Sequence, residues 1–310
     1  MGIPTIMRMI KLDRIRAAAE RARPHVLRTP MVPVEGALLK LECLQPTGSF
    51  KVRGFFAAAL ALEPDKLRRG LITVSAGNAA QACAYVAMAL KVPCRVVMYD
   101  KAPALKLEGV KRWGATPVLM PRDALLEWMA AEGWTSEPET FIHPFADPEV
   151  MAGHGGLALE LLEDVPDVAR VLVPVGGGGL MGGIASAIKG LRPEIEIIGV
   201  QSDGYPLWTR SFEAGGQVQI KPDTIADGTT APFDPRMFEL LKSCVDRWLT
   251  VPEPRLRIAI PQLASSAKVV VESAGALTYA ALEQLQAGPS TVAVVSGGNI
   301  DPKVLAVLLN

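Results

Sequence analysis

The sequence predicts an α/β fold made of two open, twisted lobes with a ligand-binding cleft between them. The 310 residues are 49% hydrophobic and 21% charged, which allows a large apolar core divided between two lobes. Short β-branched runs alternate with longer Ala- and Leu-rich stretches, the pattern of strand–turn–helix units. Three strand-like runs are followed by glycine-bearing turns, at residues 75–78, 176–179 and 296–299.

The strands can be placed from their apolar, β-branched composition. We expect them at Leu71–Val74, Cys94–Tyr99, Thr116–Met120, Val171–Val175, Ile195–Val200 and Thr291–Val295. Helices should follow the first two turns, one reaching Leu90 and one over Met181–Lys189. Ligands in open α/β sheets bind beyond the carboxyl ends of the strands, so the three turns should line one cleft.

Charge and cysteine content exclude several classes of partner. Lys plus Arg and Asp plus Glu number 32 each, so neither nucleic acid nor an anionic membrane is indicated as a partner. The four cysteines lack the close pairs of a zinc site or a disulfide scaffold, and the three histidines form no cluster that predicts a metal. No apolar run approaches the ~18 residues needed to span a bilayer. A cytoplasmic protein acting on a small molecule is expected.

Four consecutive glycines, Gly176, Gly177, Gly178 and Gly179, lie between an apolar strand and a helix. Without side chains, their backbone N–H groups can approach an anion closely, and the positive end of the helix dipole adds to the attraction. No Lys-Ser or Lys-Thr pair follows, which argues against a Walker-type nucleotide loop. A tight turn alone would need only one glycine. The run therefore predicts a phosphate site.

Lys51 is the candidate nucleophile. It follows Phe50 and precedes the Ala-rich stretch that ends at Leu62. A lysine in an arbitrary sequence is usually a surface charge, but an adjacent apolar ring helps to desolvate the amine. Desolvation lowers the pKa of the amine and favours Schiff-base formation near neutral pH.

Several segments, in this order and spacing, resemble the fold type II pyridoxal phosphate (PLP) enzymes, which share the fold of the tryptophan synthase β subunit. They are Gln45-Pro46-Thr47-Gly48-Ser49-Phe50-Lys51-Val52-Arg53-Gly54, Ser75-Ala76-Gly77-Asn78, the four glycines and Ser296-Gly297-Gly298-Asn299. Over nearly all its length the chain is similar to the serine/threonine dehydratase and serine racemase branch, including Thr224–Gly228 and Val271-Glu272-Ser273.

The resemblance implies a discontinuous large PLP-binding domain at residues 1–65 and 147–310, a small mobile domain at 66–146, PLP in the cleft between them, and a homodimer. It also implies a set of cofactor-binding residues, which are Phe50, Lys51, Asn78, Gly176, Gly177, Gly178, Gly179, Leu180 and Ser296. By the same resemblance the substrate should contact Ser75, Ala76, Gly77 and Ala79.

The resemblance gives individual residues their roles. Lys51 should hold the cofactor as a Schiff base, be displaced by the substrate amine and then remove the α-proton. Phe50 should pack against the cofactor, the glycine amides should hold its phosphate, and Asn78 should bind its phenolic oxygen. Ser296 should face the pyridine nitrogen, where a neutral hydroxyl makes the ring only a moderate electron sink. This favours elimination of a β-hydroxyl, giving a 2-oxo acid and ammonia.

Three residues depart from patterns found in this branch. Racemases have a serine at the position of Ala76, and alanine cannot carry a proton to the opposite face of a substrate. Relatives usually have histidine at the position of Ala79, so a substrate bulkier than serine or threonine is expected to fit. His154 stands where relatives more often have glutamine, and we interpret it as a buried histidine with satisfied hydrogen bonds rather than a catalytic one.

Alternatives remain open at this point. A β-replacement enzyme of the cysteine synthase type has the same fold, an amino acid racemase shares the branch, and a non-catalytic phosphate-binding homologue would need only the glycines. Serine, threonine, a β-aryl serine and a hydroxyaspartate all remain candidate substrates. Carboxylates that bind a divalent cation in eukaryotic-type racemases are replaced here by Gln201, Tyr205 and Leu207, so no metal requirement is expected.

Overall fold

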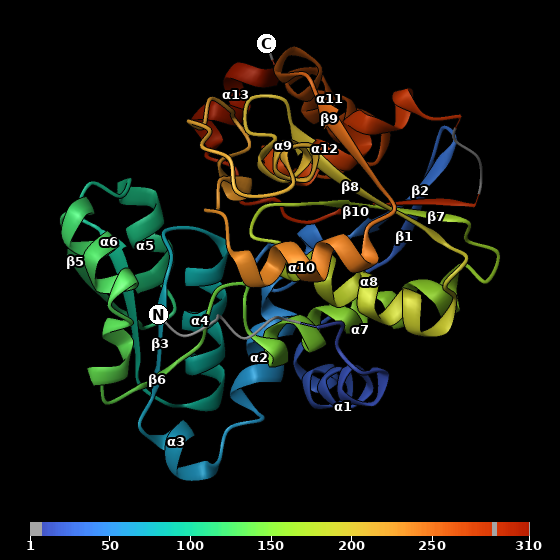
Figure 1. Ribbon diagram of the computed structural model, residues 1–310. Helices are drawn as coiled ribbons and strands as arrows, with labels where there is room; N and C mark the ends of the chain where they lie inside the picture. Colours follow the sequence, from blue (N-terminus) through green and yellow to red (C-terminus); the bar gives the residue numbers. More distant parts are fainter. Residues whose placement is uncertain (1–7, 287–289, 310) are drawn as a thin grey trace.

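The computed structural model describes residues 8–286 and 290–309, so the predicted large domain begins with seven residues outside the described part. Its strands are β1 (Met31–Val34), β2 (Ala37–Leu41), β3 (Leu71–Val74), β4 (Cys94–Tyr99), β5 (Thr116–Met120), β6 (Thr140–Phe141), β7 (Arg170–Pro174), β8 (Glu196–Ser202), β9 (Arg247–Val251) and β10 (Thr291–Val295). They form two separate sheets (Figure 1).

The α-helices are α1 (Leu12–Ala22), α2 (Lys51–Ala59), α3 (Pro64–Arg68), α4 (Asn78–Leu90), α5 (Ala104–Lys111), α6 (Arg122–Ala130), α7 (Pro148–Asp164), α8 (Gly179–Leu191), α9 (Leu207–Ala214), α10 (Pro235–Cys244), α11 (Glu253–Ser266), α12 (Ser273–Ala281) and α13 (Pro302–Leu309). Short 3-10 turns lie at η1 (Arg23–His25), η2 (Glu42–Leu44), η3 (Gly133–Ser136), η4 (Asp227–Thr229) and η5 (Leu282–Gln284).

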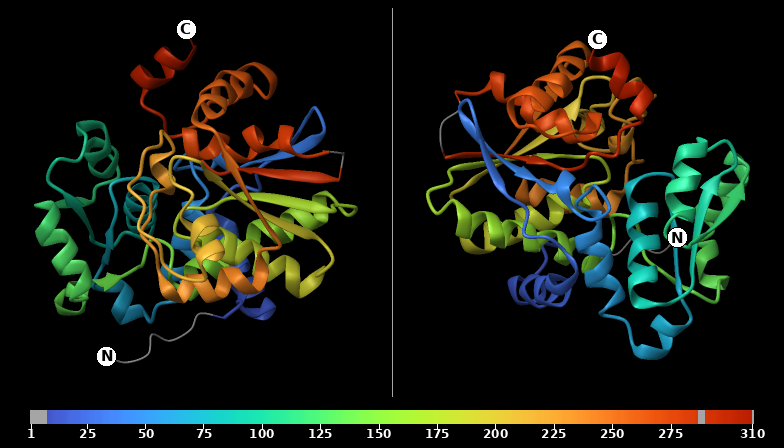
Figure 2. Two further views of the ribbon diagram at one scale, coloured as in Figure 1. Left: turned by 45° about the horizontal axis from the view of Figure 1, so that its top comes forward. Right: turned by 180° about the vertical axis from the view of Figure 1, so that it is seen from behind.

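The larger sheet has the order β1-β2-β10-β7-β8-β9. The β1–β2 pair is antiparallel, as expected for two strands joined by a tight turn, and the other pairs of this sheet are parallel. Along β7, Val171 and Val173 face one apolar cluster whereas Leu172 faces another, which is the two-residue period of a strand covered on both faces. Helices α1, α2, α7 and α8 cover the first face, and α11 and α12 cover the second (Figure 2).

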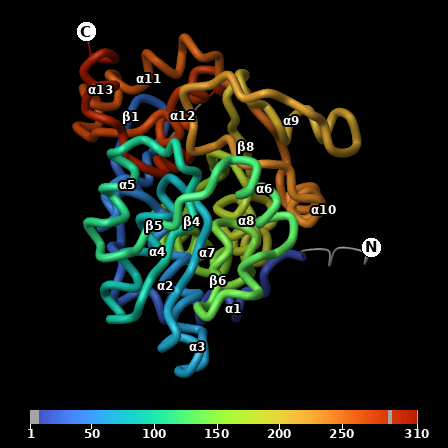
Figure 3. Tube along the Cα trace, turned by 90° about the vertical axis from the view of Figure 1, so that its left-hand side faces the viewer, coloured from blue at the N-terminus to red at the C-terminus, as the bar shows by residue number. Residues whose placement is uncertain are grey.

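The smaller sheet has the order β5-β4-β3-β6, and its strand pairs are parallel. Figure 3 views the molecule from the side of this sheet. Helix α4 packs against β3 and β4 and also against α2 of the larger lobe. Apolar residues of α4, among them Ala82 and Val86, belong to the same core cluster as Phe55 of α2, so the two lobes share continuous packing.

The predicted element positions are largely confirmed. The four expected strands β3, β4, β5 and β10 have the predicted bounds. Strand β7 begins and ends one residue earlier than predicted, and β8 begins one residue later and extends to Ser202. Helix α8 starts at Gly179 rather than Met181, because the last of the four glycines already has helical backbone geometry. No helix among residues 8–286 and 290–309 has both the length and the apolar character needed to cross a bilayer.

Candidate active site

Lys51 is the first residue of α2, and the segment before it contacts the turn that follows β10 near the end of the chain. The preceding residue, Phe50, donates its backbone N–H to Ser296 O at 3.0 Å, and Ser49 forms an isolated β-bridge with Gly297. The Lys51 Nζ atom donates to Pro144 O at 2.6 Å and lies 5.0 Å from the centroid of the Phe50 ring. Removal from water lowers the pKa of Lys51 to about 8, although the charge of Glu272 opposes the shift. The amine is therefore suited to act as a nucleophile.

The carbonyl that holds Lys51 is presented by a turn that His143 stabilises. Its Nδ1 atom accepts hydrogen bonds from the backbone N–H groups of Phe145, at 3.2 Å, and Ala146, at 2.9 Å. Burial, together with the positive charge of Arg236, lowers the pKa of His143 to about 4. The imidazole is thus a neutral acceptor at physiological pH and shapes the Pro144 turn.

The four glycines connect β7 to α8 in a conformation that explains their number. Gly178 has φ = +89°, which a residue with a side chain rarely adopts. A Cβ atom on Gly177 would lie 2.5 Å from the Phe145 ring, and one on Gly179 would lie 2.5 Å from Phe145 O. Among the described residues, no side chain caps the N-terminus of α8. Its first amides are available to an anion, so the loop fits the phosphate of PLP.

Leu180, the second residue of α8, is buried with 4% of its surface exposed. Its side chain belongs to the core cluster, so only its backbone is suited to contact an anion. Ser296 directly follows β10 and is also 4% exposed. Within the part of the chain that the structure describes, no side chain is hydrogen-bonded to the Ser296 hydroxyl. That hydroxyl is free to pair with a ring nitrogen of a bound cofactor.

Asn78 begins α4, and its amide is held at both ends. The Nδ2 atom donates to Glu272 Oε1 at 2.6 Å, and the Oδ1 atom accepts from Asn299 Nδ2 at 2.8 Å. Asn299 also donates to Thr47 O at 2.8 Å. These bonds bring the turn after β3 against the turn after β10, as the expected shared site requires. The Glu272 contact was not predicted, because Asn78 and Glu272 are separated by 194 positions.

The predicted substrate-binding residues precede or begin α4. Ser75 Oγ accepts a hydrogen bond from Gly77 N at 3.1 Å, which closes the turn. A Cβ atom on Gly77 would meet no atom of the described residues within 4 Å, so the backbone faces open space there. Ala76 packs partly against the main core. Ala79 is only 4% exposed and belongs to that core, so the extra room expected beside it stays a prediction.

His154 lies in α7 under the first turn of α2. Its ring makes an edge contact with Phe50, at 4.8 Å between centroids. It is fully buried, yet neither ring nitrogen has a hydrogen-bond partner within the described residues. The expectation that its hydrogen bonds are satisfied is therefore wrong. Gly54 of α2 lies against the ring and Gly183 of α8 lies against the Cβ atom of His154, so helix backbone packs closely around this residue.

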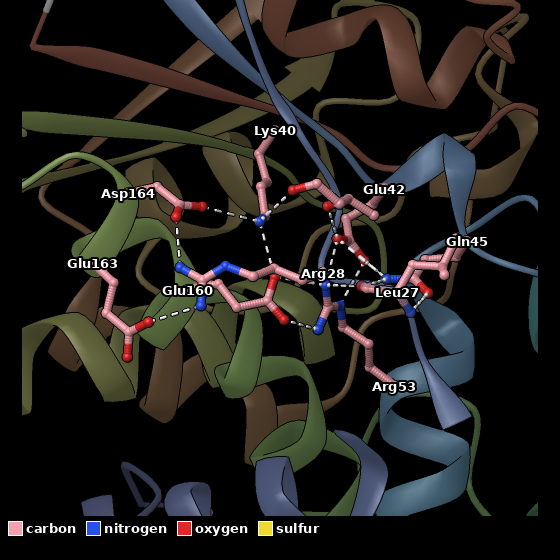
Figure 4. A network of polar contacts seen from close by, with 10 residues as sticks. Leu27, Arg28, Lys40, Glu42, Gln45, Arg53, Glu160, Glu163 and Asp164 are labelled. Carbon is pink, nitrogen blue, oxygen red and sulfur yellow. Dashed lines mark hydrogen bonds and ion pairs between the residues drawn. The ribbon is translucent and has the colours of Figure 1, made fainter. Parts of the chain in front are cut away.

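A buried ionic network anchors α2 to η2 and α7 (Figure 4). Arg53, two residues after Lys51, binds Glu42 through Nε at 2.8 Å and Nη2 at 2.9 Å, and binds Glu160 of α7 through Nη1 at 2.7 Å. The ammonium of Lys40, which is 0% exposed, lies 2.8 Å from Glu160 Oε2. Burial is the largest single influence and raises the pKa of Glu42, but Arg53, the Thr29 hydroxyl and Lys40 together lower that pKa below its ordinary value.

Gln201 illustrates how one departure from the racemases is accommodated. Its side-chain Oε1 accepts hydrogen bonds from Trp208 N at 2.9 Å and from Thr209 N at 3.1 Å. The amide oxygen thus satisfies two backbone donors in the first turn of α9, which is a structural role.

Comparison with known proteins agrees with this geometry. The family model described as pyridoxal-phosphate dependent enzyme matches residues 22–297, and this range includes Lys51, the glycine loop and Ser296. The chain belongs to the pyridoxal-phosphate dependent enzymes. As a member of this family it uses PLP, so the cofactor predicted from the sequence is confirmed.

Individual members of the pyridoxal-phosphate dependent enzymes match over most of the chain. An L-threonine ammonia-lyase of Thermotoga maritima is 39% identical, over 97% of this chain and 79% of the relative. The solved structure of T.th. threonine deaminase is 39% identical with a TM-score of 0.86, covering 94% of this chain and 99% of that one. Maize serine racemase is 30% identical with a TM-score of 0.90, covering 96% of each chain. These matches confirm the predicted fold type II architecture and the predicted lyase class.

Proposed function

We propose that the protein is a PLP-dependent ammonia-lyase that removes the β-hydroxyl of a threonine- or serine-like amino acid and releases a 2-oxo acid and ammonia. The observation that carries this proposal is the Lys51 amine, whose pKa is lowered to about 8. It is held by Pro144 O, and the next residue, Phe145, packs against the uncapped glycine loop. The names of the threonine ammonia-lyase and threonine deaminase relatives support the substrate class.

In this proposal each cofactor-binding residue has a separate role. Lys51 would be the residue that holds PLP, and its free amine would be the base that removes the α-proton. Amides of Gly176–Gly179 with Leu180 bind the phosphate, Asn78 meets the phenolic oxygen, and Ser296 meets the ring nitrogen. When bound, PLP supplies an electron sink that stabilises negative charge at the α-carbon. A hydroxyl partner at the ring nitrogen keeps that sink moderate, which favours prompt loss of the β-hydroxyl.

Elimination is favoured over racemisation by the residues around the substrate position. Inversion at the α-carbon needs a proton donor on the face opposite Lys51, and Ala76 has no group that carries a proton. Ser75 and the backbone near Gly77 lie at the start of α4, where the helix dipole attracts the substrate carboxylate. The water lost in elimination is balanced by the water consumed when the released product hydrolyses to the 2-oxo acid and ammonia.

The division into lobes belongs to the same proposal. Residues 1–65 and 147–310 form the large domain, and residues 66–146 form a small domain that moves to enclose the substrate. The separate sheet of the small domain supports this division. An exposed ion pair, Lys106 with Asp227 at 2.7 Å, joins α5 to η4 across the two domains. Such a solvent-exposed pair is weak enough to open during turnover.

A substrate panel tests the reaction directly. Purified protein loaded with PLP is incubated with L-threonine, L-serine, a β-aryl serine and a hydroxyaspartate, and 2-oxo acid and ammonia are both measured. We expect equimolar release from L-threonine or L-serine. In a parallel reaction with O-acetylserine and sulfide, formation of cysteine and acetate without 2-oxo acid release would instead identify a β-replacement enzyme.

We further propose that the enzyme is a cytoplasmic homodimer. Apolar side chains that remain exposed in the single chain support a second copy, among them Ile258 of α11 and Val307 of α13, which are 52% and 75% exposed. Sedimentation velocity at micromolar concentration should give the mass of two chains. A single-chain mass that persists as the concentration rises would contradict the dimer.

A further inference from the structure

Glu272 brings a carboxyl group into the site that the proposed reaction does not use. It precedes α12, and its backbone N–H donates to Gly297 O at 3.1 Å. A Cβ atom on Gly297 would collide with Glu272 Oε1 and would lie 3.2 Å from Asn78 Nδ2. The glycine turn after β10 therefore leaves room for this carboxyl group to reach a residue of the other lobe.

The contact with Glu272 decides which way the Asn78 amide points. Asn299 donates to Asn78 Oδ1, and Glu272 accepts from Asn78 Nδ2. A flipped amide would place oxygen against carboxylate oxygen and Nδ2 against the Nδ2 of Asn299. One hydrogen of Asn78 Nδ2 then remains to meet an acceptor oxygen on a bound ligand.

We propose that Glu272 is a positioning residue that fixes the amide of Asn78 toward the phenolic oxygen of PLP and provides the counter-charge for the Lys51 amine. This inference rests on the cofactor assignment within the proposed function. It adds a residue that acts through Asn78 and Lys51 without contacting the substrate.

The charges around Glu272 come from several elements. They are Asp227 in η4 and Lys106 in α5. The segment before Lys51 is also close, because Gly297, which accepts the Glu272 backbone N–H, forms the bridge with Ser49. Removal from water raises the pKa of Glu272 to about 7, although the Asn78 hydrogen bond opposes the shift. The negative charge of Glu272 in turn raises the pKa of Lys51, against the larger effect of desolvation. Without that charge the pKa of Lys51 would fall below about 8.

Capture of PLP by the cofactor-free protein separates the two roles, because it requires no amino acid substrate. The visible absorbance of the lysine-bound cofactor is followed against PLP concentration and against pH in the wild type, Glu272→Gln and Glu272→Ala. Glu283→Gln is the matched control, since Glu283 in η5 is an exposed carboxylate paired with Arg255. Circular dichroism verifies that each variant is folded.

Glutamine keeps an acceptor oxygen for Asn78 but removes the charge. Glu272→Gln should therefore bind PLP within about threefold of wild type, while the pH midpoint of capture moves down by about one unit because the pKa of Lys51 falls. Glu272→Ala loses the acceptor as well, and its dissociation constant for PLP should rise about 10- to 100-fold. The Glu283→Gln control should behave as wild type.

Wild-type affinity in Glu272→Ala would overturn the positioning role toward Asn78, and an unchanged pH midpoint in Glu272→Gln would overturn the counter-charge role toward Lys51. Failure of the wild-type protein to capture PLP would overturn both this inference and the proposed function. If capture behaves as expected but no substrate yields a 2-oxo acid, the role of Glu272 stands and the proposed reaction falls.

Discussion

Replacing Lys51 with alanine should abolish both turnover and the visible absorption of the bound cofactor. Burial lowers the pKa of the Lys51 amine to about 8, and the loss of this amine removes the attachment point together with the base. A general base alone accounts for ~10²- to 10⁴-fold in rate, so we expect a fall at or beyond the upper end of that range. Absorbance spectra and 2-oxo acid release measure the two effects separately.

Two further variants sharpen this experiment. Lys51→Arg keeps a positive charge next to Phe50, but a guanidinium remains protonated and forms no Schiff base, so it should be as inactive as alanine. Lys242→Ala removes an exposed lysine of α10 and should leave spectrum and rate unchanged. An alanine variant at position 51 that retained the visible band would show that another amine holds the cofactor.

Replacing Arg53 with methionine should destabilise the protein by about 3–5 kcal/mol, the range for removing one partner of a buried ion pair. Glu42 is 0% exposed and would lose the guanidinium that neutralises it, keeping the Thr29 hydroxyl and the Gln45 amide as donors. Glu160 would keep its contact with Lys40. The free energy of unfolding, obtained from urea denaturation, measures the effect.

Arg28→Met is the matched control for this variant. Arg28 is half exposed and pairs with Glu163 and Asp164 at the edge of the same network, so its loss should cost less than about 1 kcal/mol. Similar losses in the two variants would contradict the special role of Arg53.

The pH dependence of the free energy of unfolding supplies a second check. Because the folded-state pKa of Glu42 is lowered, its contribution to stability is present above the ordinary carboxyl pKa of 4.5 and is lost as the pH falls through the lowered value. This acid-side loss should shrink in Arg53→Met.

Much of the fold and part of the site could be predicted from the sequence because the signals are local. A run such as Leu71–Val74 is both β-branched and bounded by turn residues, and the structure has β3 at those positions. Likewise, four glycines after an apolar strand indicate that the backbone approaches another group too closely to leave room for side chains. The bounds of β8 were less accurate, since Gln201 and Ser202 are polar residues held in the sheet by β9.

The contacts that complete the site join residues far apart in the sequence, so local sequence patterns could not predict them. Val271-Glu272-Ser273 contributed to the family resemblance, but no spacing rule places Glu272 against Asn78 in a different lobe. The same is true of Pro144, whose backbone carbonyl holds Lys51 irrespective of its side chain. For His154 the general rule gave a wrong prediction. Buried polar groups are usually hydrogen-bonded, but neither ring nitrogen of His154 has a partner among the described residues.

The position of β10 also determines when during synthesis the protein acquires its cofactor site. This strand is encoded after the other strands of the larger sheet, yet it lies between β2 and β7 in the middle of that sheet, and its following turn bonds to the segment before Lys51. A growing chain emerges from the ribosome N-terminal part first. Lys51 therefore leaves the ribosome long before Ser296 and Gly297, which bond to the two residues preceding it, so we expect the nascent chain to retain PLP only after β10 has inserted.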